Sequence, residues 1–456
     1  MKNVLLLFLL SLTGSIFSQT HPAITSWLQN TTETGKYYMS GNPTLVDNNT
    51  LVNCQKVEYS DDFVYITTEG VPSYPTGPFL DNNPSNAEGQ NAIFKIPLEP
   101  QENTGVKTKT RGGNIGVFIN GVALFDYRDG VAWDDSMNRL CGGPGNPQCS
   151  GNFNQMDWTR DAILAEMGGF DCSKGHPAQG NYHHHQNPSA FKLDQDVVSD
   201  ICNIYDAEGL YAIDPNTHAP LIGFAYDGFP IYGAYAYKNT DGTGEIVRMK
   251  SSYQLKNITT RTNGPDIGYV YTIPNGPKAG QEETFFLGYF REDYEFINHN
   301  EPDYLDEHNG RWCITPEYPN GTYAYFCTVD ENWNSAYPYA LGPTYYGNYE
   351  NRKVNSVSES TTVYTLNSPT FDLLNRSVSI VPNPTSSLVA IQLEYLVTEV
   401  VNIQLTDING KLIMSSKIPK GSTLGYFNTE TLYNGTYLIR ISTNQQEVVK
   451  KIIVTN

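Results

Sequence analysis

VNIQLTDINGKLIM, residues 401–414, is the stretch that decides the fold of the C-terminal part of the chain. Apolar and polar residues alternate around Asn409-Gly410, a dipeptide that suits the central positions of a type I′ hairpin turn. Further short apolar runs occur at 378–381, 436–441 and 448–454. About seven short strands in roughly 80 residues predict a small Ig-like β-sandwich for residues 376–456.

The composition of the chain changes near residue 375. From Arg376 onward there are seven Lys or Arg, five Asp or Glu, and no Cys or His. The tail therefore carries a net charge of +2 and the preceding residues −21, for a formal total of −19. Residues 351–375 are rich in Ser, Thr and Asn, which is typical of a linker or a loosely held last strand. We expect a large domain at 19–350, a linker at 351–375 and a second domain at 376–456.

The large domain is predicted to be mainly β, with little helix. Runs of β-branched and aromatic residues bounded by Gly, Pro and Asn occur at 64–68, 92–96, 116–119 and 285–290. The best helix candidate is 158–167, with Asp157 as its N-cap. With 39% hydrophobic and 17% charged residues, the 456-residue chain is neither a charge-rich disordered protein nor a coiled coil.

The N-terminus predicts export. Lys2 precedes an apolar run, Val4 to Phe17, which is too short to span a bilayer comfortably and is typical of a signal peptide over residues 1–18. Gln19 rather than Cys follows the expected cleavage site, which argues against a lipid anchor. No other stretch approaches 18 apolar residues, so we do not expect an integral membrane protein. The charge of −19 argues against nucleic acids and anionic membranes as partners.

Seven cysteines in an exported chain indicate disulfides and leave at least one thiol. Sequence does not determine the pairing, but three local pairs are suggestive: Cys141 with Cys149, Cys172 with Cys202, and Cys313 with Cys327. Cys54 is the expected leftover. No His or Lys-Arg cluster is adjacent to it, so a buried, unreactive thiol is favoured over a catalytic one.

Four of the eight histidines fall within ten residues, in GHPAQGNYHHHQNP at 175–188. If 182–186 is a strand, His183 and His185 share one face, because side chains alternate along a strand. Neutral imidazole is the commonest metal ligand in proteins. The pattern predicts a transition-metal site for copper or zinc, with ligands His183 and His185, His176 as the third, and His308 or a carboxylate as the next candidate. The alternative is a strand whose imidazoles only hydrogen-bond to backbone and Tyr hydroxyls.

Asp227 lies in the turn of a predicted hairpin that begins with LIGFA at 221–225 and turns at Gly228. A carboxylate at a hairpin tip can project into a cleft, so Asp227 is a weak candidate for a catalytic residue; a turn residue is the favoured interpretation. Residues 292–308 carry seven carboxylates, for which a solvated acidic loop is favoured over a Ca²⁺ site. The sequence lacks the nucleophile-elbow, Walker A, HExxH and dinucleotide-binding motifs.

Four motifs follow one another in the tail: VPNP at 381–384, LTDINGKLI at 405–413, LYNGTYLIRI at 432–441 and KKIIV at 450–454. With these motifs the tail resembles the type A C-terminal sorting domain of the Bacteroidetes type IX secretion system. The resemblance implies that the type IX machinery recognises residues 376–456 and exports the chain, via the periplasm, across the outer membrane. The cargo is then expected to be secreted or attached to the outer cell surface.

A second series of motifs runs over residues 113–328: GNIG at 113–116, INGV at 119–122, GHP at 175–177, YHHH at 182–185, YDGFPIYG at 226–233, LDEHNGR at 305–311 and TPEYPNGTYAYF at 315–326. With these the large domain resembles the YHYH family of mostly secreted bacterial proteins. His184 stands where that motif usually has its second Tyr, and Ala324 stands where another His is often found. If that His ligates a metal, His184 or His308 would have to replace it. The resemblance implies no settled activity.

Three functions therefore remain open from the sequence. The leading one is a secreted metal-binding protein, an oxidoreductase or a metal-assisted hydrolase. The second is a metal-free surface module that binds an extracellular glycan or protein through Tyr and Trp side chains. The third is a hydrolase that uses carboxylates such as Asp227. No organic cofactor is expected.

Overall fold

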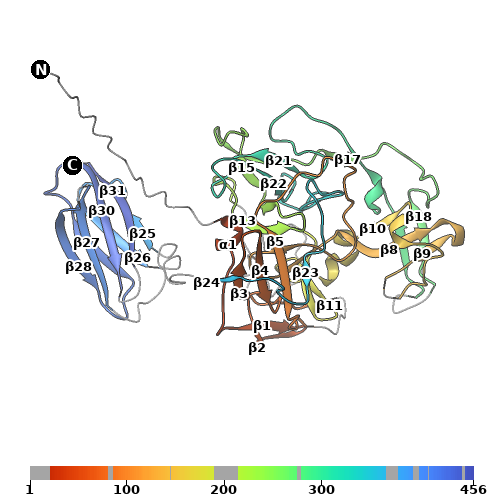
Figure 1. Ribbon diagram of the computed structural model, residues 1–456, viewed down its shortest axis with the longest axis horizontal. Helices are drawn as coiled ribbons and strands as arrows, with labels where there is room; N and C mark the ends of the chain where they lie inside the picture. The colour runs from red at the N-terminus through yellow and green to blue at the C-terminus, as the bar shows by residue number, and fades with distance from the viewer. Residues whose placement is uncertain are drawn as a thin grey trace, which may run out of the picture. The chain divides into compact units, whose positions relative to one another are not determined.

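The structure is a computed structural model that describes residues 21–80, 86–143, 145–188, 214–274, 279–365, 378–393, 400–408, 410–443 and 447–455. The predicted signal peptide at 1–18 lies outside these residues. The chain divides into two compact units, Met1–Tyr364 and Thr365–Asn456, and strands dominate both (Figure 1). Two short α-helices occur in the described part, α1 (Pro22–Thr25) and α2 (Ala162–Glu166). No described helix has the length and apolar character needed to cross a bilayer.

A five-stranded antiparallel sheet forms one side of the first unit, in the order β23-β5-β4-β3-β24. Its strands are β3 (Cys54–Tyr59), β4 (Phe63–Thr68), β5 (Ala92–Pro97), β23 (Lys353–Val354) and β24 (Thr362–Tyr364). The strands predicted at 64–68 and 92–96 are confirmed. The two edge strands come from the segment expected to begin the linker, so the chain stays with the first unit as far as Tyr364.

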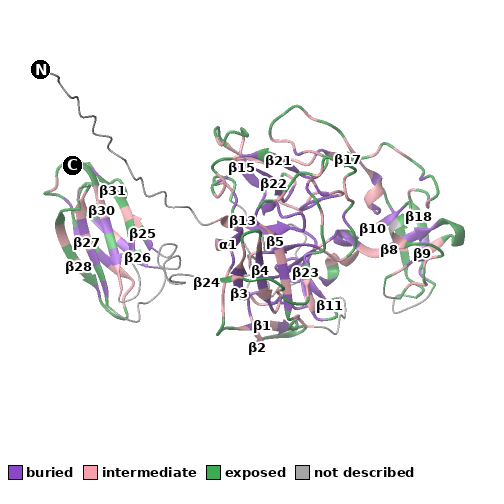
Figure 2. Ribbon diagram, viewed as in Figure 1, coloured by how far each residue is buried: buried purple, intermediate pink, exposed green. Residues whose placement is uncertain are grey.

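An eight-stranded mixed sheet carries the motifs of the large domain, in the order β11-β12-β7-β6-β13-β14-β22-β21. Its strands are β6 (Asn114–Phe118), β7 (Ala123–Phe125), β11 (Gly175–Ala178), β12 (Asn181–His184), β13 (Leu221–Ala225), β14 (Pro230–Tyr232), β21 (Gly310–Cys313) and β22 (Thr322–Phe326). The central strands β13, β14 and β22 are buried along their whole length (Figure 2). The predicted hairpin at Gly228, which has a φ of 96°, is confirmed.

A smaller lobe packs around Trp133, Trp158 and Phe285. It contains β8 (Arg128–Asp134), β9 (Arg139–Cys141), β10 (Thr159–Asp161), β18 (Tyr269–Thr272) and β19 (Glu282–Phe285), which lie together in Figure 1. The remaining strand pairs are β1 (Thr34–Met39) with β2 (Asn42–Leu51), β15 (Tyr235–Tyr237) with β16 (Ile246–Arg248), and β17 (Tyr253–Leu255) with β20 (Tyr294–Phe296).

Two predicted elements of this lobe are corrected. The helix expected over 158–167 is confined to α2, because residues 159–161 pair with β8 as a strand. The N-cap is therefore Asp161, whose carboxylate accepts the N–H of Ile163, and not Asp157. The strand expected over 285–290 ends at Phe285, since the chain then turns around the buried carboxylate of Asp293.

The disulfide predictions have different outcomes. Cys141 and Cys149 are joined, as predicted. Cys172 is disulfide-bonded, and its predicted partner Cys202 lies outside the described residues. Cys54 is a buried thiol whose pKa is raised by burial, which fits the unreactive interpretation.

The predicted Cys313–Cys327 bridge is wrong, because both residues are buried thiols. Cys313 lies opposite Thr322 at one end of the β21–β22 hairpin, whereas Cys327 follows the other end of β22. Five residues of strand separate Thr322 from Cys327, which at about 3.4 Å per residue is roughly 17 Å. A disulfide requires a Cα–Cα distance below about 7 Å.

The second unit is a seven-stranded sandwich in its described residues, as predicted. One sheet has the order β25-β26-β29 and the other β28-β27-β30-β31. Alternate residues of both sheets, such as Ile391, Ile403 and Ile439, fill one shared apolar core. The strands are β25 (Val378–Val381), β26 (Leu388–Leu393), β27 (Val401–Asp407), β28 (Leu412–Ile418), β29 (Leu424–Asn428), β30 (Gly435–Ser442) and β31 (Glu447–Val454).

A buried ion pair in the lobe supports a stability prediction. Arg261 and Asp293 are joined by two hydrogen bonds of 2.7 and 2.8 Å, and both side chains are fully buried. Asp293→Ala leaves the guanidinium without its counter-charge, so we expect a loss of about 3–5 kcal/mol in the free energy of unfolding. Urea unfolding followed by tryptophan fluorescence measures it, because all five tryptophans lie before Tyr364.

The matched control is Glu245→Ala, which breaks the exposed Lys238–Glu245 pair. Exposed ion pairs contribute about 0–1 kcal/mol, so this variant should unfold close to the parent. Equal unfolding midpoints for the two variants would contradict the role given to Asp293.

Candidate metal centre

The candidate site lies on the β11–β12 hairpin, at the edge of the eight-stranded sheet. His176 on β11 is directly opposite His183 on β12, and β12 then runs parallel to β7. His185 follows the end of β12 and stays on the face of His183, as the period-two alternation predicted. His184 points to the other face, where its Nε2 lies 2.8 Å from the hydroxyl of Tyr74. Candidate ligand atoms of His176, His183 and His185 all lie within 4.8 Å of one another.

The chain enters this hairpin through a loop organised by Asp171. One carboxylate oxygen accepts the N–H groups of Ser173 and Gly175, and the other accepts the hydroxyl of Tyr182 at 2.8 Å. Gly175 allows the close approach, because a Cβ there would lie 2.4 Å from the Tyr182 hydroxyl oxygen. The hairpin turns at Gln179-Gly180, both with positive φ. The position of His176 therefore depends on backbone contacts of a buried carboxylate.

Two hydrogen bonds to backbone carbonyls set the tautomers of His183 and His185. Nδ1 of His183 lies 2.8 Å from the carbonyl oxygen of Asn181, and Nδ1 of His185 lies 2.6 Å from that of Asp126. A carbonyl oxygen can only accept, so each Nδ1 carries a proton. The Nε2 atoms then face each other at 3.1 Å, each with a free lone pair in the neutral form.

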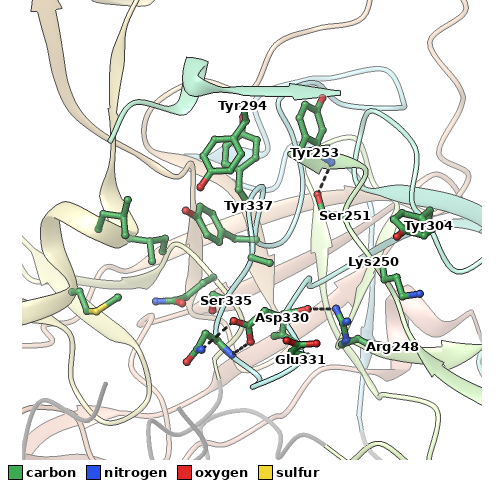
Figure 3. A pocket seen from close by; sticks show the side chains of 18 residues that line it. Arg248, Lys250, Ser251, Tyr253, Tyr294, Tyr304, Asp330, Glu331, Ser335 and Tyr337 are labelled. Carbon is green, nitrogen blue, oxygen red and sulfur yellow. Dashed lines mark hydrogen bonds between the residues drawn. The ribbon is translucent and has the colours of Figure 1, made fainter. Parts of the chain in front are cut away.

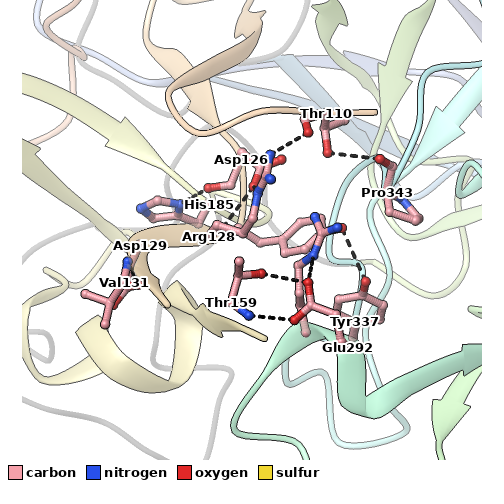
Figure 4. Close-up of polar contacts among 12 residues, drawn as sticks. Thr110, Asp126, Arg128, Asp129, Val131, Thr159, His185, Glu292, Tyr337 and Pro343 are labelled. Carbon is pink, nitrogen blue, oxygen red and sulfur yellow. Dashed lines mark hydrogen bonds and ion pairs between the residues drawn. The ribbon is translucent and has the colours of Figure 1, made fainter. Parts of the chain in front are cut away.

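The carbonyl that orients His185 is itself fixed (Figure 4). The carboxylate of Asp126 accepts both the backbone N–H and the Nε–H of Arg128, and both side chains are buried. Hydrogen bonds that hold the non-ligating nitrogen of a histidine are a common feature of metal sites, where they orient the ring.

A fourth residue, Glu166 at the end of α2, completes the group. Its Oε2 lies 3.3 Å from Nε2 of His176 and 3.2 Å from Nε2 of His185. That oxygen is buried without a hydrogen bond, and so are both ring nitrogens of His176. Buried polar atoms nearly always have a hydrogen-bond partner. Among the three histidines and Glu166, three buried polar atoms have none.

The electrostatics of the group suit ligation by His183 and Glu166 and favour the protonated form of His185. Burial, with the neighbouring His176 and His185, lowers the pKa of His183 well below its usual value. Burial lowers the pKa of His185 as well, but the neighbouring Glu166 outweighs it and raises this pKa overall. Burial would raise the pKa of Glu166, yet His176 and His185 hold it below its usual value. The site therefore contains a neutral His183 and a carboxylate that stays ionised.

Aromatic rings pack against two of the buried histidines. Phe125 stacks on His183 with 3.8 Å between ring centroids, and Phe170 meets His176 edge-on at 4.9 Å. The three histidines are each less than 8% exposed. Charged and polar interactions are stronger in such a low-dielectric environment than in water.

The structure separates the other sequence candidates from this group. Nδ1 of His308 lies 2.6 Å from the Thr344 hydroxyl, and the residue is not a member of the three-histidine group. His184, the alternative replacement ligand, points to the opposite face, and burial lowers its pKa to about 3. Asp227 is 1% exposed, and its carboxylate accepts the Tyr325 hydroxyl and the N–H groups of Gly347 and Phe229. These contacts fit the turn interpretation of Asp227.

No sequence pattern points to Glu166, Phe125, Phe170 or the Asp126 carbonyl as parts of this site. Glu166 occurs at the end of the one predicted helix of the large domain, ten residues before His176, and nothing in its local pattern distinguishes it from a solvated carboxylate. The sequence therefore predicted that a carboxylate could be a ligand, but it did not indicate which residue supplies it.

Comparison with known families agrees with this organisation. A family model described as YHYH protein matches residues 93–338, more than half of the chain. The chain belongs to the YHYH family. A second model, described as a secretion system C-terminal sorting domain, matches residues 379–455 and confirms the predicted sorting domain. Together they indicate a secreted or cell-surface protein. No curated protein matches the chain.

The buried Asp227 supports a prediction about pH. Burial raises its pKa to about 6 in the folded chain, against about 3.9 in an unfolded one. Between about pH 4 and pH 6 the folded chain holds a proton that the unfolded chain lacks, so this group makes stability fall with rising pH by about 1.4 kcal/mol per unit. Asp227→Asn removes that dependence. The parent-minus-variant difference in unfolding free energy should therefore be larger at pH 5 than at pH 7.5, by roughly 1 kcal/mol.

The measurement is urea unfolding by tryptophan fluorescence at the two pH values. Glu301→Gln, which changes a largely exposed carboxylate, is the control and should follow the pH dependence of the parent. A difference between parent and Asp227→Asn that stays constant with pH would show that Asp227 is ionised throughout.

Proposed function

We propose that this secreted YHYH-family protein binds one divalent transition-metal ion, zinc or copper, through His176, His183 and His185. The observation that carries the proposal is the pair of Nε2 atoms 3.1 Å apart, each turned inward because its Nδ1 donates to a backbone carbonyl. Two neutral imidazoles cannot satisfy such a contact, because both present lone pairs. A proton on Nε2 of His185, whose pKa Glu166 raises, can satisfy it, and so can a metal cation that displaces that proton.

The distances support this assignment. Zn–N bonds are about 2.0–2.1 Å long, so two ligand nitrogens at tetrahedral positions are roughly 3.3–3.4 Å apart. The His183–His185 contact is close to that value. His176, whose ring nitrogens lack hydrogen bonds, supplies the third ligand, and Glu166 supplies the fourth or holds a metal-bound water. Three histidines with one carboxylate suit zinc and copper better than Mg²⁺ or Ca²⁺, which prefer oxygen ligands.

A bound ion would supply Lewis acidity and, for copper, electron transfer. The protein would supply the buried environment beside Phe125 and Phe170 and the orientation of the rings. The contacts of Asp227 do not favour a carboxylate-dependent hydrolase, so that alternative is not proposed.

Elemental analysis tests the proposal. The full chain, purified without a His-tag or chelator after exposure to metal, should carry about one zinc or copper ion. The double variant His183→Ala/His185→Ala should carry none, because it loses both facing nitrogens. Circular dichroism verifies that the double variant is folded.

His308→Ala and His299→Ala are the matched controls, since neither residue belongs to the cluster. Both should retain the metal content of the parent. Loss of metal in His308→Ala with retention in the double variant would place the site elsewhere, and a metal-free parent would refute the proposal.

Glu166 provides a graded test. Glu166→Gln keeps the shape of the side chain but removes the negative charge beside His176 and His185. Loss of such a supporting carboxylate typically weakens metal binding about 10–100-fold. Competition against a chromophoric chelator measures the dissociation constant, with Glu245→Gln as an exposed control. Equal dissociation constants for parent and Glu166→Gln would exclude Glu166 from the site.

A further inference from the structure

The first unit contains a cleft of about 650 Å³ beside helix α2. This volume lies within the roughly 300–1,000 Å³ that is usual for small-molecule sites. Met167, which follows Glu166, and Gln186, which follows His185, both line the cleft. The histidines themselves are not among its lining residues. The cleft is therefore a separate surface feature that neighbours the candidate metal centre.

Tyrosines form one side of the cleft (Figure 3). Tyr294 and Tyr337 stack with 4.2 Å between ring centroids, and Tyr253 meets Tyr337 edge-on at 5.3 Å. Tyr304 is held by stacking on His299 at 3.9 Å. Tyr253, Tyr294 and Tyr304 remain half-buried, so they keep part of their surface open. Rings fixed in this way offer contact area without a large loss of side-chain entropy on binding.

The cleft also has a polar side of balanced charge, which adjoins Tyr304, because Nζ of Lys250 lies 5.0 Å from the centroid of that ring (Figure 3). It presents Arg248 and Lys250 against Asp330 and Glu331. Lys250 is paired with Asp303 at 2.7 Å, and Arg248 donates to the carbonyl oxygen of Val329 at 2.7 Å. With two charges of each sign and both cations already engaged, the cleft has no net preference for an anion or a cation.

Hydrogen bonds hold the loop that forms this polar side in place. The carboxylate of Asp330 accepts the N–H groups of Asn332 and Asn334 and the side-chain amide of Asn334. Ser335 donates to the side chain of Asn187. Glu331 is exposed beside this loop and is thus available to accept hydrogen bonds from a ligand. Ordered polar groups beside fixed aromatic rings are suited to a ligand with apolar faces and many hydroxyls.

We propose that this cleft binds a neutral oligosaccharide. A saccharide presents C–H surfaces to the tyrosines and hydroxyls to the polar side, and it needs no charged partner. The sorting domain indicates an extracellular location, where polysaccharides are available as ligands. The proposal does not depend on the metal site.

Isothermal titration calorimetry on the full chain tests it, with EDTA present so that metal plays no part. The probes are cellotetraose, xylotetraose, mannotetraose, maltotetraose and chitotetraose. At least one should bind the parent, and Tyr304→Ala and Glu331→Ala should each weaken that binding about tenfold. Both positions are partly or fully exposed, so the variants should keep the melting temperature of the parent.

Trp312→Ala is the matched control, because Trp312 is 59% exposed and is not among the residues that line the cleft. It should bind the saccharide as the parent does. Two results would overturn the proposal: no heat from any of the five tetraoses at millimolar concentration, or undiminished binding in both cleft variants.

Discussion

The contact between Nε2 of His183 and Nε2 of His185 is the constraint around which the site is organised. Each ring is held in place by a hydrogen bond from its other nitrogen to a backbone carbonyl. Those carbonyls belong to the hairpin and to the residues that follow β7, so neither ring can turn away without breaking a buried hydrogen bond. The sheet therefore keeps the two Nε2 atoms 3.1 Å apart in a buried space beside Phe125 and Phe170.

The surrounding fold explains how this arrangement is maintained. The hairpin is an edge element, but its entry loop is held by the buried Asp171, and Glu166 approaches from the end of α2. The helix end and the hairpin, which are close in sequence, thus meet the residues that follow β7 at one point. Sites on strands and helices hold their side chains more rigidly than sites on loops. The tyrosine-lined cleft also borders α2, through Ile163 and Leu164, but it does not include the histidines.

Much of this architecture was predictable from local sequence patterns. Alternation and turn residues located the sandwich, the Gly228 hairpin and the common face of His183 and His185, because these features depend on neighbours in sequence. The errors arise where hydrogen bonds and strand register, rather than the local residue pattern, set the structure. The start of α2 depends on the pairing of β10 with the distant strand β8. The end of β19 depends on the hydrogen bonds of Asp293, and the absence of a Cys313–Cys327 bridge on the register of the β21–β22 hairpin. Glu166 joins the site through tertiary packing that no local period encodes.

Anomalous X-ray diffraction from crystals of the full chain grown with zinc or copper tests the central claim most directly. Data collected at the absorption edge of the metal should show one strong peak, about 2.0–2.2 Å from a ring nitrogen of each of His176, His183 and His185. A crystal saturated with metal that shows no peak at this cluster, and in which the two Nε2 atoms keep their 3.1 Å contact, would contradict it.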